Sequence, residues 1–227
     1  MELELKKECL DTYELGEPQT LTQEETAETI VPDYCPDIAR IISAEGVVCL
    51  HGGTEQDGVT GTVRVTVLYT PENESGVRAL EFAMPFSAQG EGLAGCAHVV
   101  VETEIELLES RMLNPRKIFT RCKLVTHLAG CRKVCLTISS DAETDPALLV
   151  EKRCCGQTVS LLRQVAEKDL TFSETMSLSL GREGAAELLH CRANGIVTET
   201  KAIGNKLIFK GVFLVSALYR TIGGQLA

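Results

Sequence analysis

The sequence is poor in aromatic residues and contains no tryptophan. Of its 227 residues only 4% are aromatic. Proteins that bind single-stranded nucleic acid stack the bases on exposed aromatic rings. Sugar-binding surfaces also use flat rings, so the composition argues against both kinds of platform.

An excess of positive charge is also missing. Lys and Arg number 22 against 32 Asp and Glu, which gives a net charge of −10. An acidic surface repels phosphate backbones and anionic lipid, so we expect neither nucleic acid nor a membrane surface as a partner. The only basic segment, "NPRKIFTRCK" at 114–123, is interpreted as the solvated face of a strand.

Long hydrophobic runs are absent as well. The first residues, "MELELKKECLDTYELGE", contain no apolar segment typical of a secretory signal. No apolar run approaches the roughly 18–20 residues that cross a bilayer. The sequence therefore predicts a protein that begins in the cytoplasm and does not insert into a membrane.

Cysteine is plentiful, but its spacing does not suit a metal or redox site. None of the ten cysteines forms a C-x2-C pair. We expect mainly small buried side chains with reduced thiols, the alternative being later oxidative cross-linking in an assembled structure. The sequence predicts no metal and no cofactor.

Alternation of apolar and polar residues dominates the chain. Along "TVRVTVLY", alternate side chains from Val63 to Tyr69 point one way, and Thr62, Arg64 and Thr66 point the other. Similar segments follow, separated by glycine-rich and polar turns. This pattern predicts an all-β fold of antiparallel strands, as a sandwich or an open barrel.

Two short helices are expected within this fold. The first follows Pro36, where Ile38, Ile41 and Ile42 have the spacing of an apolar helical stripe and Gly46 ends it. The second is expected from Ala185 to Cys191.

The chain contains an internal repeat. "GTVRVTVLYT" begins at Gly61 and "GVFLVSALYR" begins at Gly211, 150 residues later. "ETIVPDYCPDIARIISAEGVV" from Glu28 likewise corresponds to "ETMSLSLGREGAAELLHCRANGIV" from Glu174. We infer a complete copy at 1–145 and a partial second copy at 146–227, joined by the acidic linker "SSDAETDP". Because later strands of the second copy are missing, we expect a segment of a longer gene product, or strands replaced by another surface.

Residues that could catalyse a reaction do not converge in the sequence. The four histidines show no metal-binding pair spacing, and neither a phosphate-binding loop nor a G-x-S-x-G motif is present. His190 and Cys191, as neighbours on a helix, would point apart. We predict a non-catalytic protein, although a polar pocket holding His127 or His190 would favour a hydrolase.

Copy one resembles the SPOCS domain family. The resemblance rests on "IVPDYCPDIARIISAEGVV", "GTVRVTVLY", "AMPFSAQGEG", "VVVETEIELLESRMLNPRKI" and "CKLVTHL", in the order that the family shows. SPOCS domains occur in proteins of endospore-forming bacteria, often ahead of a LysM module. Copy two lacks both Pro-Asp pairs of the helix-start motif, so a partner that reads this motif would engage copy one only.

The resemblance implies a structural adaptor of spore coat or spore envelope morphogenesis. It would act in the mother cell cytoplasm at the forespore surface, through protein–protein binding. The implied partners are spore coat morphogenetic proteins, among them a SpoIVA-like ATPase, with self-association as a further possibility. The alternative is a module that binds cell-wall carbohydrate.

The helix-start motif supplies the candidate binding residues. An exposed turn would present them to a partner, and the competing interpretation is that they cap the helix and close the core. These residues are Pro32, Asp33, Tyr34, Pro36 and Asp37.

Overall fold

The computed structural model describes residues 4–51, 58–143 and 183–227 as continuous stretches. Between the last two it also describes 151, 153, 155–156, 158–166, 168, 171, 173–175 and 177. Every regular element in these residues is a strand, and all the strand pairs are antiparallel. The all-β prediction is confirmed. Nowhere in the described chain is there a helix with the length and apolar character to cross a membrane.

One sheet is built around the longest strand, β7 (Lys117–Glu143). On one edge β7 pairs with β6 (His98–Asn114). On its other edge it pairs first with β2 (Gln19–Ile30) and then with β1 (Glu4–Leu15). The N-terminal segment therefore follows β7 along its whole length as one interrupted strand.

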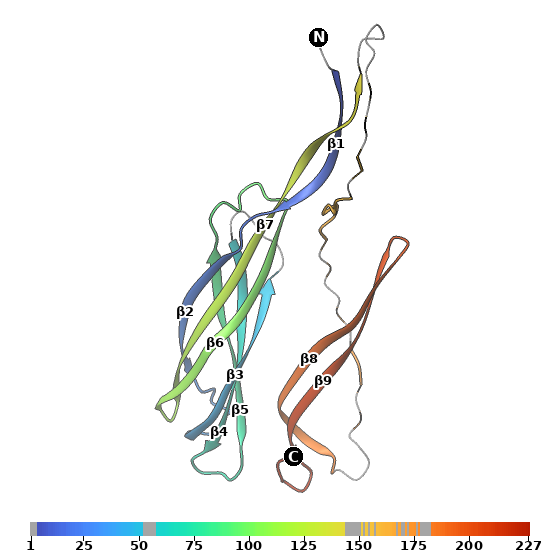
Figure 1. Ribbon diagram of the computed structural model, residues 1–227. Helices are drawn as coiled ribbons and strands as arrows, with labels where there is room; N and C mark the ends of the chain where they lie inside the picture. The colour runs from blue at the N-terminus through green and yellow to red at the C-terminus, as the bar shows by residue number, and fades with distance from the viewer. Residues whose placement is uncertain are drawn as a thin grey trace.

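A second sheet packs against the β2–β7–β6 part of the first. It is a meander of β3 (Ile38–His51), β4 (Gly58–Pro71) and β5 (Arg78–Gln89), with β4 in the centre. We call these two packed sheets the sandwich (Figure 1).

The hydrophobic core lies between the two sheets. As predicted, β4 turns Val63, Val65, Val67 and Tyr69 inward, each at most 1% exposed. From the opposite sheet, β7 contributes Ile118, Cys122 and Leu124, all fully buried. Burying one side chain of this size contributes about 1.5–3 kcal/mol, so this two-layer contact holds the sandwich together.

Beyond the sandwich, β7 continues as a two-stranded ribbon with β1 (Figure 1). A disulfide joins Cys9 to Cys135 across this ribbon, with their Cα atoms 5.7 Å apart. The expectation of reduced thiols is wrong at these two positions, because only the pairing of β1 with β7 brings together residues 126 apart in sequence. Ser139–Glu143, expected in the acidic linker, belong to β7 and face the start of β1.

A separate hairpin lies beside the sandwich. It consists of β8 (Ala185–Ile203) and β9 (Lys206–Thr221), joined by a tight turn in which Gly204 has φ +61°. A left-handed glycine suits a two-residue hairpin turn. We call this element the hairpin.

Both predicted helices are wrong. The residues after Pro36 form β3, and Ala185–Cys191 begin β8. The pairing of β3 with β4 shifts register between Ile38 and Arg40 and again between Ile41 and Ser43. Each β-bulge adds one residue, so apolar side chains that would recur every second residue recur every third, which imitates a helical stripe.

Candidate functional site

The predicted binding residues lie in the turn that carries the chain from one sheet to the other. β2 ends at Ile30 and β3 begins at Ile38. The backbone N–H of Val31 donates to the carbonyl of Arg116 at 2.9 Å, and that of Ile38 donates to the carbonyl of Pro115 at 2.9 Å. The turn is thereby fixed at both ends against the turn between β6 and β7.

The guanidinium of Arg116 holds this turn from within. Its Nη1 donates to the carbonyl of Cys35 at 2.8 Å and to Asp37 Oδ1 at 3.0 Å. Its Nη2 donates to the carbonyl of Val31 at 2.9 Å and to Asp33 Oδ1 at 3.0 Å. Only the planar, forked guanidinium could reach four acceptors in this way, so Arg116 organises the turn.

The five predicted residues are brought together in this one turn, but their environments differ. The carboxylates of Asp33 and Asp37 form ion pairs with Arg116. This favours the interpretation that both carboxylates stabilise the turn. The carbonyl of Pro36 accepts a hydrogen bond from the Tyr69 hydroxyl at 3.3 Å. Tyr34 is 88% exposed, so its ring is the part of the turn open to a partner.

Burial raises the pKa of the Tyr69 hydroxyl to about 12, with the neighbouring Cys35 as the next cause. The fold thus favours the neutral phenol, which can donate to the turn. Sequence reasoning missed Arg116 as the centre of this arrangement. The signal was an arginine in the basic segment at 114–123, but its role emerges only once the turn between β6 and β7 lies against residues 31–37.

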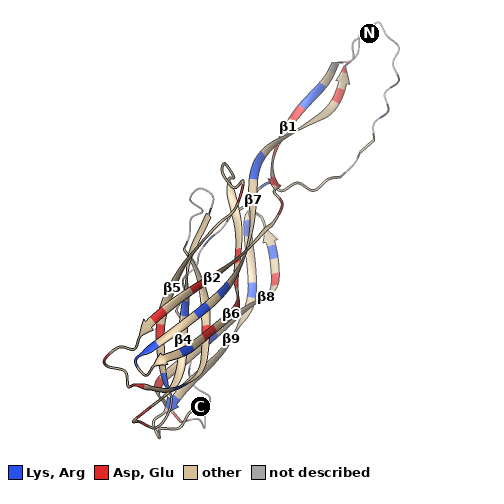
Figure 2. Ribbon diagram, turned by 90° about the vertical axis from the view of Figure 1, so that its left-hand side faces the viewer, with Lys and Arg blue, Asp and Glu red and all other residues tan. Residues whose placement is uncertain are grey.

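The basic segment at 114–123 is paired with acidic neighbours. On the outer face of its sheet, Lys117 lies 2.5 Å from Glu28 and Arg121 lies 2.7 Å from Glu24, both on β2. Lys123 lies 2.8 Å from Glu106 on β6. Figure 2 shows these basic bands along β7 between acidic bands on the flanking strands. This cross-strand charge ladder agrees with the interpretation of a solvated strand face.

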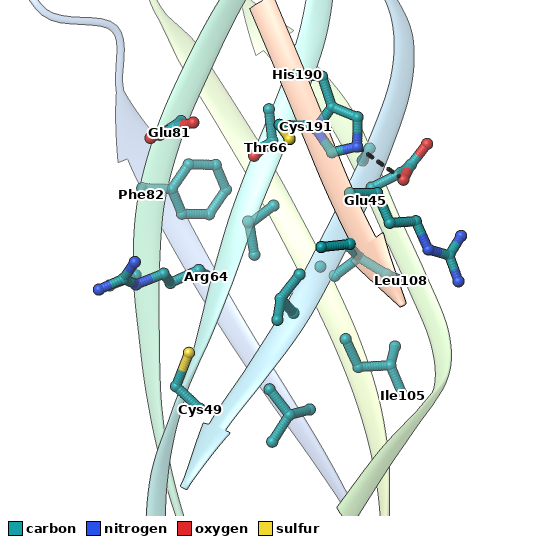
Figure 3. Close-up of a pocket in the computed structure, with 18 of the residues that line it drawn as sticks. Glu45, Cys49, Arg64, Thr66, Glu81, Phe82, Ile105, Leu108, His190 and Cys191 are labelled. Carbon is teal, nitrogen blue, oxygen red and sulfur yellow. Dashed lines mark hydrogen bonds and ion pairs between the residues drawn. The ribbon is translucent and has the colours of Figure 1, made fainter. Parts of the chain in front are cut away.

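A groove of about 1150 Å³ separates the sandwich from the start of β8 (Figure 3). Its charged lining residues are Glu45, Arg64, Glu81, Glu104 and Arg192, and His190 and Cys191 also line it. His190 Nε2 is 3.1 Å from Glu45 Oε2. A histidine paired with a carboxylate at the junction of two elements joins them, so His190 links β8 to β3.

The other histidines also have structural partners. His127 Nδ1 lies 3.0 Å from Thr20 Oγ1, and His51 Nε2 lies 3.1 Å from Thr62 Oγ1. The ring of His98 lies 6.0 Å from that of Tyr13. Among the described residues no group of His, Cys, Asp and Glu could hold a metal ion.

The cysteines outside the disulfide have varied surroundings. Cys122 is fully buried in the core. Burial, and to a smaller extent the negative charge of Glu25, raises the pKa of its thiol to about 11. Cys155 and Cys191 are exposed. Cys154, the other member of the adjacent pair noted in the sequence, lies outside the described residues.

The hairpin exposes most of its apolar side chains. On β9, Leu207, Phe209 and Leu214 are each 58–61% exposed. Burial is confined to the end near the sandwich, at Leu189, Tyr219 and Thr221. Exposed apolar side chains lie on both faces of β9, with Phe209 on one and Leu214 on the other.

Polar contacts join the hairpin to the sandwich. Glu187 Oε2 lies 2.9 Å from Arg220 Nη1 within the hairpin and 3.5 Å from Arg78 Nη1 on β5. Arg220 Nη2 also donates to the carbonyl of Val77 at 2.6 Å. The hydrogen bond that Arg78 donates to Glu74 raises the pKa of the guanidinium further, so this arginine stays charged.

The β3–β4 and β8–β9 pairs share one pairing pattern. Tyr69 faces Ile41 in the first pair, and Tyr219 faces Leu188 in the second. The first two register shifts fall at corresponding places, where the extra residues are Ala39 and Ile42 in β3 and Ala186 and Leu189 in β8. A third shift, between Val197 and Glu199, is found only in the β8–β9 pair.

The common register continues along both pairs. Leu50 faces Gly61 in the sandwich, and Val197 faces Gly211 in the hairpin. The two glycines that began the sequence comparison thus occupy equivalent places in two hairpins with matching bulges.

Comparison of the chain with protein-family models, curated proteins and solved structures gave no significant match. The resemblance to SPOCS domains therefore rests on the sequence segments alone.

Proposed function

We propose that this chain is a duplicated β-rich binding protein that acts through protein–protein contacts and catalyses no reaction. The matching registers of β3–β4 and β8–β9 support two copies of one unit, at 1–145 and 146–227.

The observation that carries the proposal is the open apolar surface of the hairpin. Leu207, Phe209 and Leu214 lie on β9, which forms a sheet of only two strands with β8 in the described chain. An isolated two-stranded hairpin is at best marginally stable in water. An apolar surface of this kind is typical of a site that another protein covers.

The biological setting follows from the resemblance of copy one to SPOCS domains. We place the protein among the adaptors of spore coat or spore envelope assembly, in the mother cell at the forespore surface. Its partners would include coat morphogenetic proteins such as a SpoIVA-like ATPase. The exposed ring of Tyr34 and the apolar side chains of the hairpin are two surfaces that a partner could contact.

A binding assay with purified components tests this function. The chain is immobilised and offered the SpoIVA-like ATPase or, separately, purified peptidoglycan. We expect retention of the ATPase, and at least about a tenfold loss of affinity in Phe209→Asp or in Tyr34→Ala, depending on which surface binds.

The result that would overturn the proposal is retention of peptidoglycan without the ATPase, which would identify a carbohydrate-binding module. A chain that binds neither the ATPase nor itself would equally contradict a role as an adaptor.

A further inference from the structure

β1 and residues 131–143 of β7 form a two-stranded ribbon that extends beyond the sandwich (Figure 1). In the described chain no second sheet packs against this ribbon. Its apolar side chains are correspondingly exposed, with Leu5 at 45%, Leu136 at 42% and Ile138 at 37%. A two-stranded ribbon without such packing is at best marginally stable in water. The ribbon therefore needs a connection other than hydrophobic packing to stay ordered.

The disulfide between Cys9 and Cys135 supplies this connection. Cys9 lies opposite Thr137, and Cys135 lies opposite Asp11, so the disulfide joins the two strands diagonally on one face of the ribbon. Two residues further along the same face, Lys133 Nζ lies 3.2 Å from Asp11 Oδ2. Both of these charged side chains are exposed, and an exposed ion pair contributes little to stability. The disulfide is therefore the strongest side-chain connection across the ribbon.

Both half-cystines are exposed, so small thiols in solution can reach them. The other described cysteines are free. Exposed disulfides are more often labile or regulatory than buried ones. In the cytoplasm, where we place the protein, glutathione and thioredoxin keep most thiols reduced. A disulfide at this position can thus open and close with the redox state of its surroundings.

The ribbon also holds a segment of the proposed second copy. The carbonyl of Leu162 accepts hydrogen bonds from the N–H of Tyr13 at 2.7 Å and from the hydroxyl of Thr12 at 2.9 Å. Thr12 is only 8% exposed, so this contact is shielded from water. Both donors lie on β1 within four residues of Cys9. Their position therefore depends on whether β1 stays paired with β7.

We propose that the Cys9–Cys135 disulfide is a redox-sensitive link that controls the order of the ribbon. In the oxidised chain it keeps β1 on β7 and so keeps Leu162 on β1. In the reduced chain β1 separates from the end of β7, and the contact with Leu162 is lost.

The reaction is thiol–disulfide exchange with a small thiol such as glutathione. The glutathione thiolate attacks one of the two sulfur atoms, forms a mixed disulfide with that cysteine and releases the other as a thiolate. A second glutathione then attacks the mixed disulfide and releases the first cysteine. Two glutathione molecules thus give up two electrons and two protons and become one glutathione disulfide, while Cys9 and Cys135 become thiols. Excess glutathione disulfide reverses both steps.

The sandwich should be unaffected by this reaction. β2 pairs with β7 at 117–128, where Ile118, Cys122 and Leu124 are fully buried. The N–H of Gly16 donates to the carbonyl of Gly130 at 2.8 Å, which fixes the chain where the ribbon meets the sandwich. We therefore expect the separation to stop near Leu15.

Hydrogen–deuterium exchange of the full chain tests this proposal. The chain is equilibrated with glutathione or with glutathione disulfide, and exchange is followed by mass spectrometry in peptides from β1 and from β2. We expect exchange in β1 to be at least about tenfold faster in the reduced chain, because local opening exposes its amides. Exchange in β2 should be the same in both states and shows that the sandwich stays folded.

Two variants assign the effect to this disulfide. The double variant Cys9→Ser and Cys135→Ser should show fast exchange in β1 in both buffers. Cys191→Ser removes an exposed cysteine outside the disulfide and should keep the response of the wild type.

Four outcomes would overturn the proposal. One is equal exchange in β1 in both buffers, with thiol titration showing that the disulfide has been reduced. Another is a chain in which mass spectrometry finds no Cys9–Cys135 disulfide in glutathione disulfide. Faster exchange in β2 on reduction would show that the sandwich itself opens, and loss of the response in Cys191→Ser would assign the effect to a different thiol.

Discussion

The sandwich and the hairpin pair their strands in the same way but differ in what covers them. Val65 of β4 is 1% exposed, whereas Val215, its counterpart on β9, is 36% exposed. The Tyr69 hydroxyl bonds to the carbonyl of Pro36, whereas the buried hydroxyl of Tyr219 has no partner in the described chain. Local sequence therefore sets pairing and bulges, whereas burial depends on the next strand and the opposite sheet.

The largest contrast is expected at the corresponding valines. Val65→Asp buries an unpaired charge and should lower the free energy of unfolding of the sandwich by about 3–5 kcal/mol. Val215→Asp adds a charge at a partly exposed site and should cost less than about 1 kcal/mol. Urea denaturation at low protein concentration measures both, and equal losses would show that the two strands are equally covered.

A smaller difference in stability is expected between substitutions in the turn before β3 and substitutions elsewhere on the sandwich surface. Arg116→Ala leaves the carbonyls of Val31 and Cys35 without their donor, and should lower the free energy of unfolding by about 2 kcal/mol. Arg121→Ala removes an exposed ion pair with Glu24 and should cost less than about 1 kcal/mol.

Thermal and urea unfolding of the two arginine variants provide the comparison. If Arg116→Ala proves as mild as Arg121→Ala, the Arg116 contacts do not stabilise the turn. Asp33→Ala and Asp37→Ala should then be judged by partner binding instead of stability.

The smallest contrast concerns the two corresponding tyrosines. Tyr69→Phe loses one hydrogen bond and should cost about 1 kcal/mol, whereas Tyr219→Phe removes a buried hydroxyl without a partner and should be neutral or slightly stabilising. Chemical denaturation at neutral pH measures both, and a loss in Tyr219→Phe equal to that in Tyr69→Phe would contradict this difference.

Alkaline pH sharpens the same comparison. The pKa of Tyr69 is about 12 in the fold, against 10.0 for an ordinary tyrosine. The stabilisation from its neutral form is fully present below pH 10.0 and is lost as the pH rises to about 12. Tyr69→Phe should lack this part of the pH dependence, and an unchanged alkaline profile would refute the assignment.

Much of the sandwich could be predicted from alternation alone. The inward row from Val63 to Tyr69 and the outward row with Arg64 follow from a period of two, because apolar and polar residues alternate along β4. The helices were predicted wrongly at the two places where bulges change the spacing. Ile38 is buried and Ile42 is 50% exposed, a difference that a helical stripe does not predict.

The candidate turn could be located in the sequence, but its organisation could not. Pro32 to Asp37 are contiguous, whereas Arg116 reaches them only because the turn between β6 and β7 lies beside the end of β2. The Cys9–Cys135 pair depends in the same way on a long-range strand pairing. Contacts of this kind are set by topology, and topology is not encoded in any single window of sequence.

The pairing of the N-terminal segment with β7 has a consequence for synthesis. A ribosome that has just released Cys9 must add the intervening residues, 126 in sequence separation, before Cys135 can meet it. At about 5–20 residues per second this takes roughly 6–25 seconds. During that time β1 and β2 lack their pairing strand. The emerging polypeptide should therefore depend on chaperones until β7 has been translated.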